Sequence, residues 1–586
     1  MTRLSDILEK RKLECFPCVI QLSESGRDAD GDEALALTYR DAWNALNEHQ
    51  TWLDKRVNEL SGAQSQKQQE HREDVTVLAY LSSNSPDMML SVLAAANDSR
   101  IMVALLNTRW TTTEIVSVLQ SSRGRTILLC NQEELLETAR NVQEMLHHSN
   151  VRILTIPDFA DKYWSNAWWQ SPKAATATNS KNTCDDNYGD DRSIDSEIQK
   201  LSSQPEVDAL LMFTSGTTSA KSKGVRLSHR SLRIQALAKL RYPCQYNRMT
   251  RMLLSTVPLF HVGGFNNALA VWLAGGTWIL PESKSSFDPS VVLKCISHVR
   301  YPINTLVVVP AMLYAMLGLI PKEKQYDGME CILIGGQSAS PDMLDKLRKV
   351  FSGAPRIIQT YACTEAASSL TFHNTSNTKG HDPSHTPNGD CVGYPPPHVQ
   401  LQLVDRNDSN KVITQPFQLG TITTRGPHMM IGYWDRLSSE TASKTPFLPE
   451  DVKSSKTWFV TNDYGYTDDQ GLLYYCGRNT DIVRTGGETV LAYEVERTLL
   501  QHTDITECAV FGLRDDKFGE SVCAAIVSSL GLNLSLHDIR RHCQNLAGYK
   551  RPRKVFHVPT LPRNSSGKVL KHKLIQQFQT PLQSKL

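Results

Sequence analysis

The sequence lacks three features that would each have pointed to a broad class of protein. It contains no run of 18 or more apolar residues, so we expect no membrane-spanning helix. Its 63 basic and 61 acidic residues nearly cancel, so we expect no nucleic-acid partner, which would require a basic excess. The N-terminal segment is charged throughout and has no apolar core, so it does not resemble a secretory signal.

Cysteine is present without the pattern of a disulfide framework, since the 13 cysteines are scattered at irregular spacings. The C-terminal tripeptide is informative in a positive sense. Its residues are Ser584, Lys585 and Leu586, and S-K-L at a free C-terminus is the peroxisomal import address. The sequence therefore predicts a peroxisomal location, with the peroxisomal import receptor as a partner.

The apolar pattern of the first 350 residues predicts an α/β fold. Strand-like runs (VTVLAYL, RIMVALL, RTILLC and VRILTI) alternate with helical stretches such as SPDMMLSVLAAAN and TTEIVSVLQ. That alternation favours parallel or mixed sheets with helices packed on them. Residues 61–74 and 170–205 are polar and aperiodic, and we interpret both as surface insertions.

The pattern changes after residue 400, where shorter runs such as VQLQLVD, GTITTRG and GLLYYCG predict a β-rich subdomain. Beyond residue 480 the chain still has about 105 residues with two strands and two helices, enough for a small domain. We expect a large N-terminal domain over residues 1–478 and a small, mobile α+β C-terminal domain over 481–583. Residues 479–480 would form the hinge between them, and 584–586 the targeting tripeptide.

The stretch MFTSGTTSAKSKG (212–224) is rich in hydroxyl groups, glycine and lysine, and it follows an apolar run. Glycines let backbone N–H groups approach an anion, and hydroxyls and lysines donate to its oxygens. The stretch is not a Walker A loop, because Lys223 precedes the second glycine and Gly216 and Gly224 are eight residues apart. Taken alone, it fits either a phosphate-binding loop or an ordinary polar linker.

Four further motifs follow in order: QTYACTE (359–365), WFVTND (458–463), GRNTDIVRTGGETVLAYEVE (477–496) and PRNSSGK (562–568). With TSGTT…KGV…SH (214–229), they resemble the adenylate-forming superfamily of acyl-CoA synthetases, luciferases and peptide-synthetase adenylation domains. The resemblance extends over about residues 35–575. It implies an AMP-binding N-terminal domain and a small C-terminal domain. It also implies ATP and coenzyme A as co-substrates and Mg²⁺ as the metal ion. It also implies an acid–thiol ligase that forms an acyl-adenylate and passes the acyl group to coenzyme A.

The resemblance assigns the ATP site by position. Its phosphate-binding residues would be Thr214, Ser215, Gly216, Thr217, Thr218 and Lys223. This loop departs from the family pattern, because it is one residue longer and lacks the usual glycine and proline. The departure leaves both Lys221 and Lys223 open for the usual lysine role. The other ATP contacts would be Gly335, Gly336, Gln337, Thr360, Tyr361, Asp463 and Arg478.

Several of these residue types suit their implied roles. Tyr361 would stack on the adenine, which suits any purine face. Asp463 would bind both ribose hydroxyls, because a carboxylate accepts two hydrogen bonds from a vicinal diol. Arg478 would approach the ribose or a phosphate. Asn462 stands where the family usually has a glycine before the aspartate.

The same resemblance implies three catalytic residues and a metal ligand. Lys568 would bridge the substrate carboxylate and the α-phosphate, which Thr364 would also contact. His261 would close the carboxylate site and make room for coenzyme A. Glu365 would hold Mg²⁺. Each is an expectation from the motif, since Lys568 without it is an ordinary surface lysine.

The coenzyme A site would lie in the small domain, which in this family rotates between the two half-reactions. Its residues would be Arg484, Gly486, Gly487 and Glu488. The two glycines would line the pantetheine tunnel, where the absence of side chains leaves room for the thiol.

Three stretches narrow the choice of the acid substrate. TEAASSLTF (364–372), TTRGPHMMIGYW (423–434) and RTGGETVLAYEVE (484–496) resemble the o-succinylbenzoate–CoA ligases of menaquinone and phylloquinone synthesis, particularly the plant type. A substrate with two carboxylates would favour a cationic or hydroxyl-rich pocket end. Ser368, Ser369 and Thr371 could supply hydroxyls there, and His261 and Phe265 are further expected acyl-binding residues. Two alternatives remain: another peroxisomal acyl-CoA ligase (4-coumarate-like, fatty acid or oxalate), or a degenerate, non-catalytic nucleotide-binding relative.

Overall fold

The structure is a computed structural model, and it describes most of the chain in separate ranges. These are 3–12, 17–22, 35–62, 76–99, 101–120, 126–131, 133–146, 151–159, 161–163, 190–214, 222–254, 256–281, 287–298, 301–321, 323–337, 339–377, 390–405, 408–434, 457–478, 481–528, 533–563 and 569–579. Within this part of the chain, no helix combines the length and the apolar character that crossing a bilayer requires.

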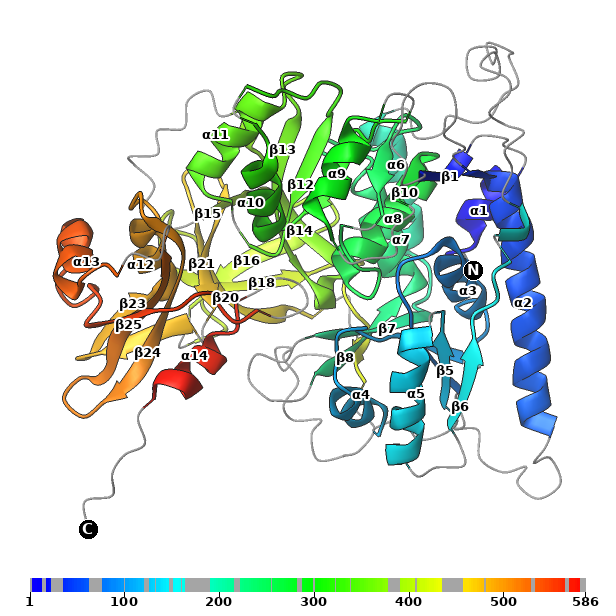
Figure 1. The fold of residues 1–586 in the computed structure, drawn as a ribbon, viewed down its shortest axis with the longest axis horizontal. Coiled ribbons are helices and arrows are strands. Elements are labelled where there is room, and N and C mark those ends of the chain that lie inside the picture. Colours follow the sequence, from blue (N-terminus) through cyan, green and yellow to red (C-terminus); the bar gives the residue numbers. More distant parts are fainter. Residues whose placement is uncertain are drawn as a thin grey trace.

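Two large sheets with parallel centres form most of the molecule (Figure 1). The first has the strand order β14 (Ser368–Asn374), β13 (Arg356–Cys363), β12 (Cys331–Ile334), β11 (Thr305–Val308), β9 (Arg251–Leu253), β10 (Thr277–Pro281), β1 (Pro17–Leu22) and β2 (Leu35–Thr38). Neighbours from β13 to β1 run parallel, and the edge strands β14 and β2 are antiparallel.

The second large sheet has the order β19 (Gly432–Tyr433), β8 (Lys223–Ser228), β7 (Asp208–Thr214), β4 (Ile101–Leu105), β3 (Thr76–Leu81), β5 (Thr126–Cys130) and β6 (Val151–Thr155). Strands β7 to β6 are parallel, whereas β8 and β19 add antiparallel edges. The apolar runs that predict strands in the first 160 residues are β3 to β6, so the α/β prediction is confirmed.

Two smaller sheets complete the fold. An antiparallel sheet has the order β15 (Asp390–Gly393), β21 (Leu473–Arg478), β20 (Phe459–Thr467), β18 (Gly420–Arg425), β16 (Gln400–Val404) and β17 (Val412–Ile413). The last sheet has the strand order β23 (Glu488–Leu491), β22 (Ile482–Thr485), β25 (Gly519–Ser528) and β24 (Ile505–Asp515), and β26 (Lys554–His557) pairs with β25 in parallel. The β-rich region after residue 400 and the small α+β unit are therefore as predicted, but the described part of that unit has five strands and three α-helices where the sequence predicted two of each.

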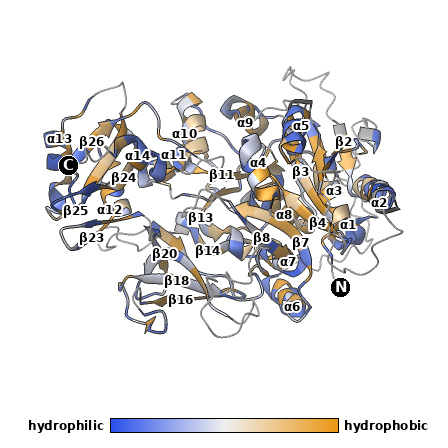
Figure 2. Ribbon diagram, turned by 90° about the horizontal axis from the view of Figure 1, so that it is seen from below, coloured by the Kyte–Doolittle hydropathy of each residue, from blue (hydrophilic) through white to orange (hydrophobic). Residues whose placement is uncertain are grey.

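The helices lie on both faces of the large sheets and beside the last sheet (Figure 1). Their bounds are α1 (Asp6–Arg11), α2 (Tyr39–Gly62), α3 (Pro86–Ala95), α4 (Thr112–Leu119), α5 (Glu133–Leu146), α6 (Asp191–Ser202), α7 (His229–Leu237), α8 (Val262–Ala274), α9 (Pro289–Ile296), α10 (Pro310–Leu319), α11 (Pro341–Val350), α12 (Ala492–Leu499), α13 (Leu536–His542) and α14 (Lys571–Phe578). Figure 2 shows apolar residues over α8, β3 and β4 and polar residues over the outer helices α2 and α6.

Helix α6 corrects one expectation, because the aperiodic interpretation of residues 170–205 is wrong for its last part. Asp190 caps the helix by accepting from the Ser193 backbone N–H. The helix buries Ile194, Ile198 and Leu201, which recur at the spacing of one helical face. The many charged residues between these three concealed that spacing in the sequence.

Candidate active site

Several of the residues expected to bind nucleotide lie where parallel strands end, the edge at which open α/β sheets bind ligands. Gly335 to Gln337 follow β12, and the backbone N–H of Gly335 donates to Val308 at the end of β11. The next strand, β13, ends at Cys363 and continues into the short 3₁₀ helix η3 (Thr364–Ala366). This helix contacts β7 and β8 of the other large sheet. The helix that holds Thr364 and Glu365 therefore lies against the two strands that flank the expected phosphate-loop segment.

The turn that carries Thr364 and Glu365 contains a strained residue, since Ala367 has φ +57°. Buried partners fix the turn on both sides. The side-chain amide of Gln235 donates to the carbonyl oxygens of Ala366 and Ser369, each at 2.9 Å. The turn thus depends on a residue of α7, far away in the sequence.

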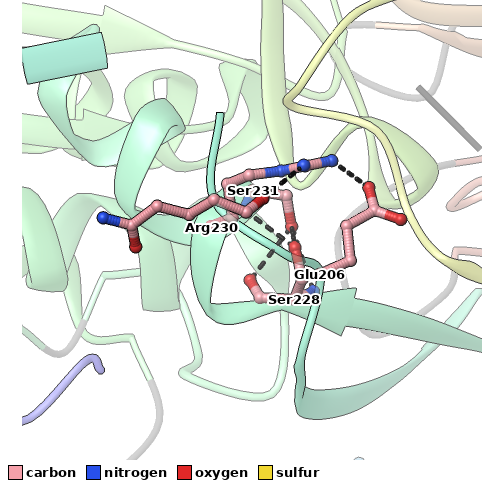
Figure 3. A network of polar contacts seen from close by, with 5 residues as sticks. Glu206, Ser228, Arg230 and Ser231 are labelled. Carbon is pink, nitrogen blue, oxygen red and sulfur yellow. Dashed lines mark hydrogen bonds and ion pairs between the residues drawn. The ribbon is translucent and has the colours of Figure 1, made fainter. Parts of the chain in front are cut away.

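Helix α7 is itself anchored where it begins (Figure 3). Ser228 and Ser231 form a capping box, with the Ser231 N–H donating to the Ser228 hydroxyl at 2.9 Å. The Arg230 guanidinium donates a hydrogen bond to the Glu206 carboxylate and another to the carbonyl of Gln204, the latter at 2.9 Å. These contacts tie the helix to the segment that leads into β7.

Lys239, just after α7, connects the turn to the expected acyl-binding helix α8. Its ammonium donates to Asn266 Oδ1 of α8 at 2.7 Å, to Ser368 Oγ at 3.0 Å and to the Gln235 carbonyl at 3.2 Å. Lys239 is fully buried, and burial lowers the pKa of its ammonium to about 7. The expected acyl residue Ser368 is therefore already hydrogen-bonded to a buried lysine.

Glu365 has a partner that the sequence did not single out. The Tyr433 hydroxyl donates to Glu365 Oε1 at 2.8 Å, and the Met430 N–H donates to the Glu365 carbonyl at 2.8 Å. The Lys223 ammonium lies 5.4 Å from the centre of the Tyr433 ring, within cation–π range. Tyr433 stands in the GYW part of TTRGPHMMIGYW, so its residue type was visible, but its partner was not.

Asp463 forms a second cluster with Tyr361 and Arg478. The Tyr361 hydroxyl donates to Asp463 Oδ2 at 2.6 Å, and Arg478 Nε lies 3.3 Å from Asp463 Oδ1. Asp463 and Arg478 are register partners on β20 and β21. Burial, and then the negative charges of Glu365 and Asp463, raise the pKa of the Cys363 thiol, which places both carboxylates near the end of β13.

Asn462 explains one departure from the family pattern. Its φ is +61°, in the left-handed region where glycine is favoured and asparagine is the best tolerated alternative. The asparagine therefore preserves the backbone that presents Asp463.

The expected acyl-binding residues lie at the start of α8. His261 is the N-cap residue of this helix, and burial, followed by the positive charge of Arg109, lowers the pKa of its imidazole to about 4. The ring is therefore neutral at physiological pH. Phe265, one turn later, is fully buried, and Ser369 is 2% exposed.

The expected coenzyme A residues form the hairpin between β22 and β23. Thr485 and Glu488 pair across it, so Gly486 and Gly487 are its two turn residues. Their φ values are +61° and +82°, which is the requirement of a type I′ turn. The turn geometry therefore requires glycine at these two positions, in addition to the predicted need for space in the pantetheine tunnel. Arg484 and Glu488 are exposed on either side of the turn.

Some expected residues lie outside the described part of the chain. They are Ser215, Gly216, Thr217 and Thr218 of the phosphate loop, the hinge 479–480, Lys568 and the tripeptide 584–586. Thr360, by contrast, is placed in β13, with its hydroxyl donating to the Thr371 carbonyl at 2.9 Å.

The residues present fit Mg²⁺ delivered with ATP. Glu365 offers one carboxylate, and the Thr364 hydroxyl is adjacent in sequence. Within the described ranges, no three His, Cys, Asp or Glu side chains gather as a metal site. Mg²⁺ usually binds through one or two carboxylates together with substrate phosphates, so a single glutamate on a turn against the strands that flank the expected phosphate loop suits this ion.

Comparison with known proteins agrees with this arrangement. Residues 33–434 match the AMP-binding enzyme family, and residues 494–568 match its C-terminal domain. The chain is 32% identical to the chloroplastic/peroxisomal 2-succinylbenzoate–CoA ligase of Arabidopsis thaliana, over 63% of this chain and 67% of that protein. It is 30% identical to the oxalate–CoA ligase of the same plant, over 66% and 71%.

The fold is similar to that of the o-succinylbenzoate coenzyme A synthetase of Bacillus subtilis, solved with ATP and a magnesium ion. The TM-score is 0.71 at 22% identity, covering 97% of this chain and 98% of that one. The chain belongs to the AMP-binding enzyme family and is an AMP-forming acid–thiol ligase, an acyl-CoA synthetase.

Proposed function

We propose that this ligase joins 2-succinylbenzoate to coenzyme A, using ATP and Mg²⁺. The acid's carboxylate oxygen attacks the α-phosphorus of ATP, forming an acyl-adenylate and releasing diphosphate. The coenzyme A thiol then attacks the acyl carbonyl, forming the thioester and releasing AMP. The observation that carries the proposal is the meeting of Thr364 and Glu365 with the two strands that flank the phosphate-loop segment.

Each cluster has a defined part in this reaction. Mg²⁺ on Glu365 would neutralise charge on the phosphates, and Thr364 would donate to the α-phosphate. Asp463 would accept from the ribose hydroxyls while Arg478 holds its carboxylate in place. Lys568 would bridge the carboxylate and the α-phosphate, and neutral His261 would close the acid site without adding charge.

The second half-reaction would use the small unit. Rotation about residues 479–480 would remove Lys568 and bring the Gly486–Gly487 turn to the acid site. The exposed Arg484 and Glu488 beside this turn would then meet the coenzyme A chain.

Two observations support 2-succinylbenzoate as the acid. The SSLTF segment forms β14, and the Ser368 hydroxyl is hydrogen-bonded to the Lys239 side chain, which gives this wall hydrogen-bonding groups suited to a second carboxylate. The Arabidopsis relative is named for the same substrate. Its name also includes a peroxisomal location, in agreement with the SKL tripeptide, and we propose that location for this protein.

The acid is tested by mass spectrometry of coenzyme A thioesters formed from 2-succinylbenzoate, oxalate, cinnamates and fatty acids. We expect a clear preference for 2-succinylbenzoate. Preference for another acid would leave the ligase assignment intact and contradict 2-succinylbenzoate as the substrate. ATP binding without any thioester would favour the degenerate relative. A fusion of a fluorescent protein to the last residues tests the location, and a diffuse signal would contradict it.

The catalytic lysine is tested separately. We expect Lys568→Ala to bind ATP yet to lose most adenylation, measured as acid-dependent diphosphate release. Lys573→Ala, an exposed lysine of α14, is the matched control and should keep normal rates. Full adenylation by Lys568→Ala would contradict the assignment.

A further inference from the structure

Tyr433 contacts residues from both halves of the expected phosphate and metal site. Its hydroxyl donates to Glu365 Oε1 at 2.8 Å. Its ring lies 5.4 Å from the Lys223 ammonium, at the end of the phosphate-loop segment. The Tyr433 side chain is half-buried.

The backbone around Tyr433 is held on both sides. Tyr433 and Gly432 pair with Val225 and Arg226 of β8 in antiparallel register. The Trp434 N–H donates to the Gly224 carbonyl at 2.7 Å. Three residues before Tyr433, the Met430 N–H donates to the Glu365 carbonyl at 2.8 Å. The backbone that carries Tyr433 is therefore fixed to the strand after the expected phosphate loop and, through Met430, to the backbone of the glutamate.

This geometry constrains the Glu365 carboxylate. A hydrogen bond to Oε1 limits rotation about the last side-chain bond and leaves Oε2 to face a cation. Mg²⁺ demands near-ideal octahedral geometry, so the orientation of its single protein carboxylate matters. Groups that orient a metal ligand typically change metal affinity by about 10–100-fold when they are removed.

We propose that Tyr433 is a positioning residue that orients Glu365 for the divalent cation delivered with ATP. This inference rests on the proposed metal role of Glu365. Tyr433 acts through the glutamate and not on the reacting atoms.

The test is Tyr433→Phe, which removes the hydroxyl and keeps the ring over Lys223. Binding of Mn²⁺ is followed by electron paramagnetic resonance with a non-hydrolysable ATP analogue present. Binding of the analogue alone is measured in EDTA. We expect Mn²⁺ affinity to fall about 10–100-fold, while analogue affinity in EDTA stays within about twofold.

Two further variants make the result decisive. Tyr394→Phe is the matched control, because Tyr394 is 48% exposed and its hydroxyl donates to the Gln470 carbonyl. It should bind Mn²⁺ as the unaltered protein does. Glu365→Gln should abolish the analogue-dependent Mn²⁺ site.

The outcomes distinguish a failure of the Tyr433 role from a failure of the proposed metal site. If Glu365→Gln abolishes the Mn²⁺ site and Tyr433→Phe does not weaken it, the role of Tyr433 is overturned and the proposed site stands. Equal loss of analogue affinity with and without metal would show a merely structural role and would also overturn it. If Glu365→Gln binds Mn²⁺ normally, the metal assignment fails and Tyr433 with it.

Discussion

The turn after β13 and the turn between β22 and β23 both contain residues with positive φ, but they reach it by different means. In the first, Ala367 holds φ +57° and is fully buried. Alanine gains nothing from this conformation, which is unfavourable for any residue with a Cβ. The Gln235 amide holds the carbonyls of Ala366 and Ser369, and Lys239 holds the Ser368 hydroxyl. Surrounding groups therefore impose the shape of this turn.

The second turn has glycine at both central positions, with φ +61° and +82°. It is exposed, and a Cβ added at Gly487 would meet nothing within 4 Å. Its shape comes from the residues themselves. The turn expected to hold the metal and the α-phosphate is therefore fixed by distant packing, whereas the turn expected to meet coenzyme A is fixed locally. Substitutions should reveal the difference.

The largest effect is expected from Gln235→Met, which keeps the length of the side chain and removes its donors. The carbonyls of Ala366 and Ser369 would lose their buried partners, and each such loss costs about 1–3 kcal/mol. We expect a loss of about 2–6 kcal/mol in the free energy of unfolding, measured with urea. Diphosphate release should fall as well.

Gln325→Met is the control for this change, because Gln325 is exposed and donates to the Lys349 carbonyl at the surface. It should change the free energy of unfolding by less than about 0.5 kcal/mol. Equal effects of the two variants would mean that the Gln235 amide does not hold the turn.

The second effect concerns pH and Lys239. Burial lowers the pKa of this ammonium to about 7, against about 10.4 in the unfolded chain. Between these values the unfolded state binds more protons, so the Lys239 contribution to stability rises with pH. Lys239→Met removes this contribution. From pH 7 to 8.5, the difference in unfolding free energy between unaltered protein and variant should move by about 1.5–2 kcal/mol in favour of the unaltered protein.

The measurement is a urea titration at both pH values, with Lys324→Met as an exposed control that should show no such change. A pH-independent difference for Lys239→Met would show that the lysine keeps an ordinary pKa. It would also show that burying the charged ammonium does not lower the free energy of unfolding.

The third effect is smaller and local. Gly487→Ala places a Cβ at φ +82°, where strain alone costs about 1–2 kcal/mol. We expect a loss of that size in unfolding free energy and slower thioester formation with an unchanged adenylation rate. Gly548→Ala is the control, because Gly548 also has open space but no positive φ. Equal losses in the two variants would remove the backbone explanation.

The sequence predicted what depends on local pattern. Apolar runs identified β3 to β6, and ordered motifs identified the residue types around Glu365 and Asp463. The sequence missed what depends on tertiary contact. Gln235 in α7 and Lys239 just after it are ordinary polar residues, and only the fold brings them into contact with β14. Helix α6 was missed because charged residues obscured a three-residue apolar stripe.

The smallest effect should come from Ala367→Gly, the reverse of the change at Gly487. Glycine relieves left-handed strain worth about 1–2 kcal/mol, but it adds backbone entropy to the unfolded chain worth about 0.5–1 kcal/mol. We expect the unfolding free energy to change by less than about 1 kcal/mol and the adenylation rate to stay within about twofold, since Gln235 still holds both neighbouring carbonyls. The check combines urea unfolding with single-turnover diphosphate release. A sharp fall in rate at unchanged stability would show that Ala367 itself restrains the turn. The two turns would then no longer differ in whether distant packing or their own residues fix their shape.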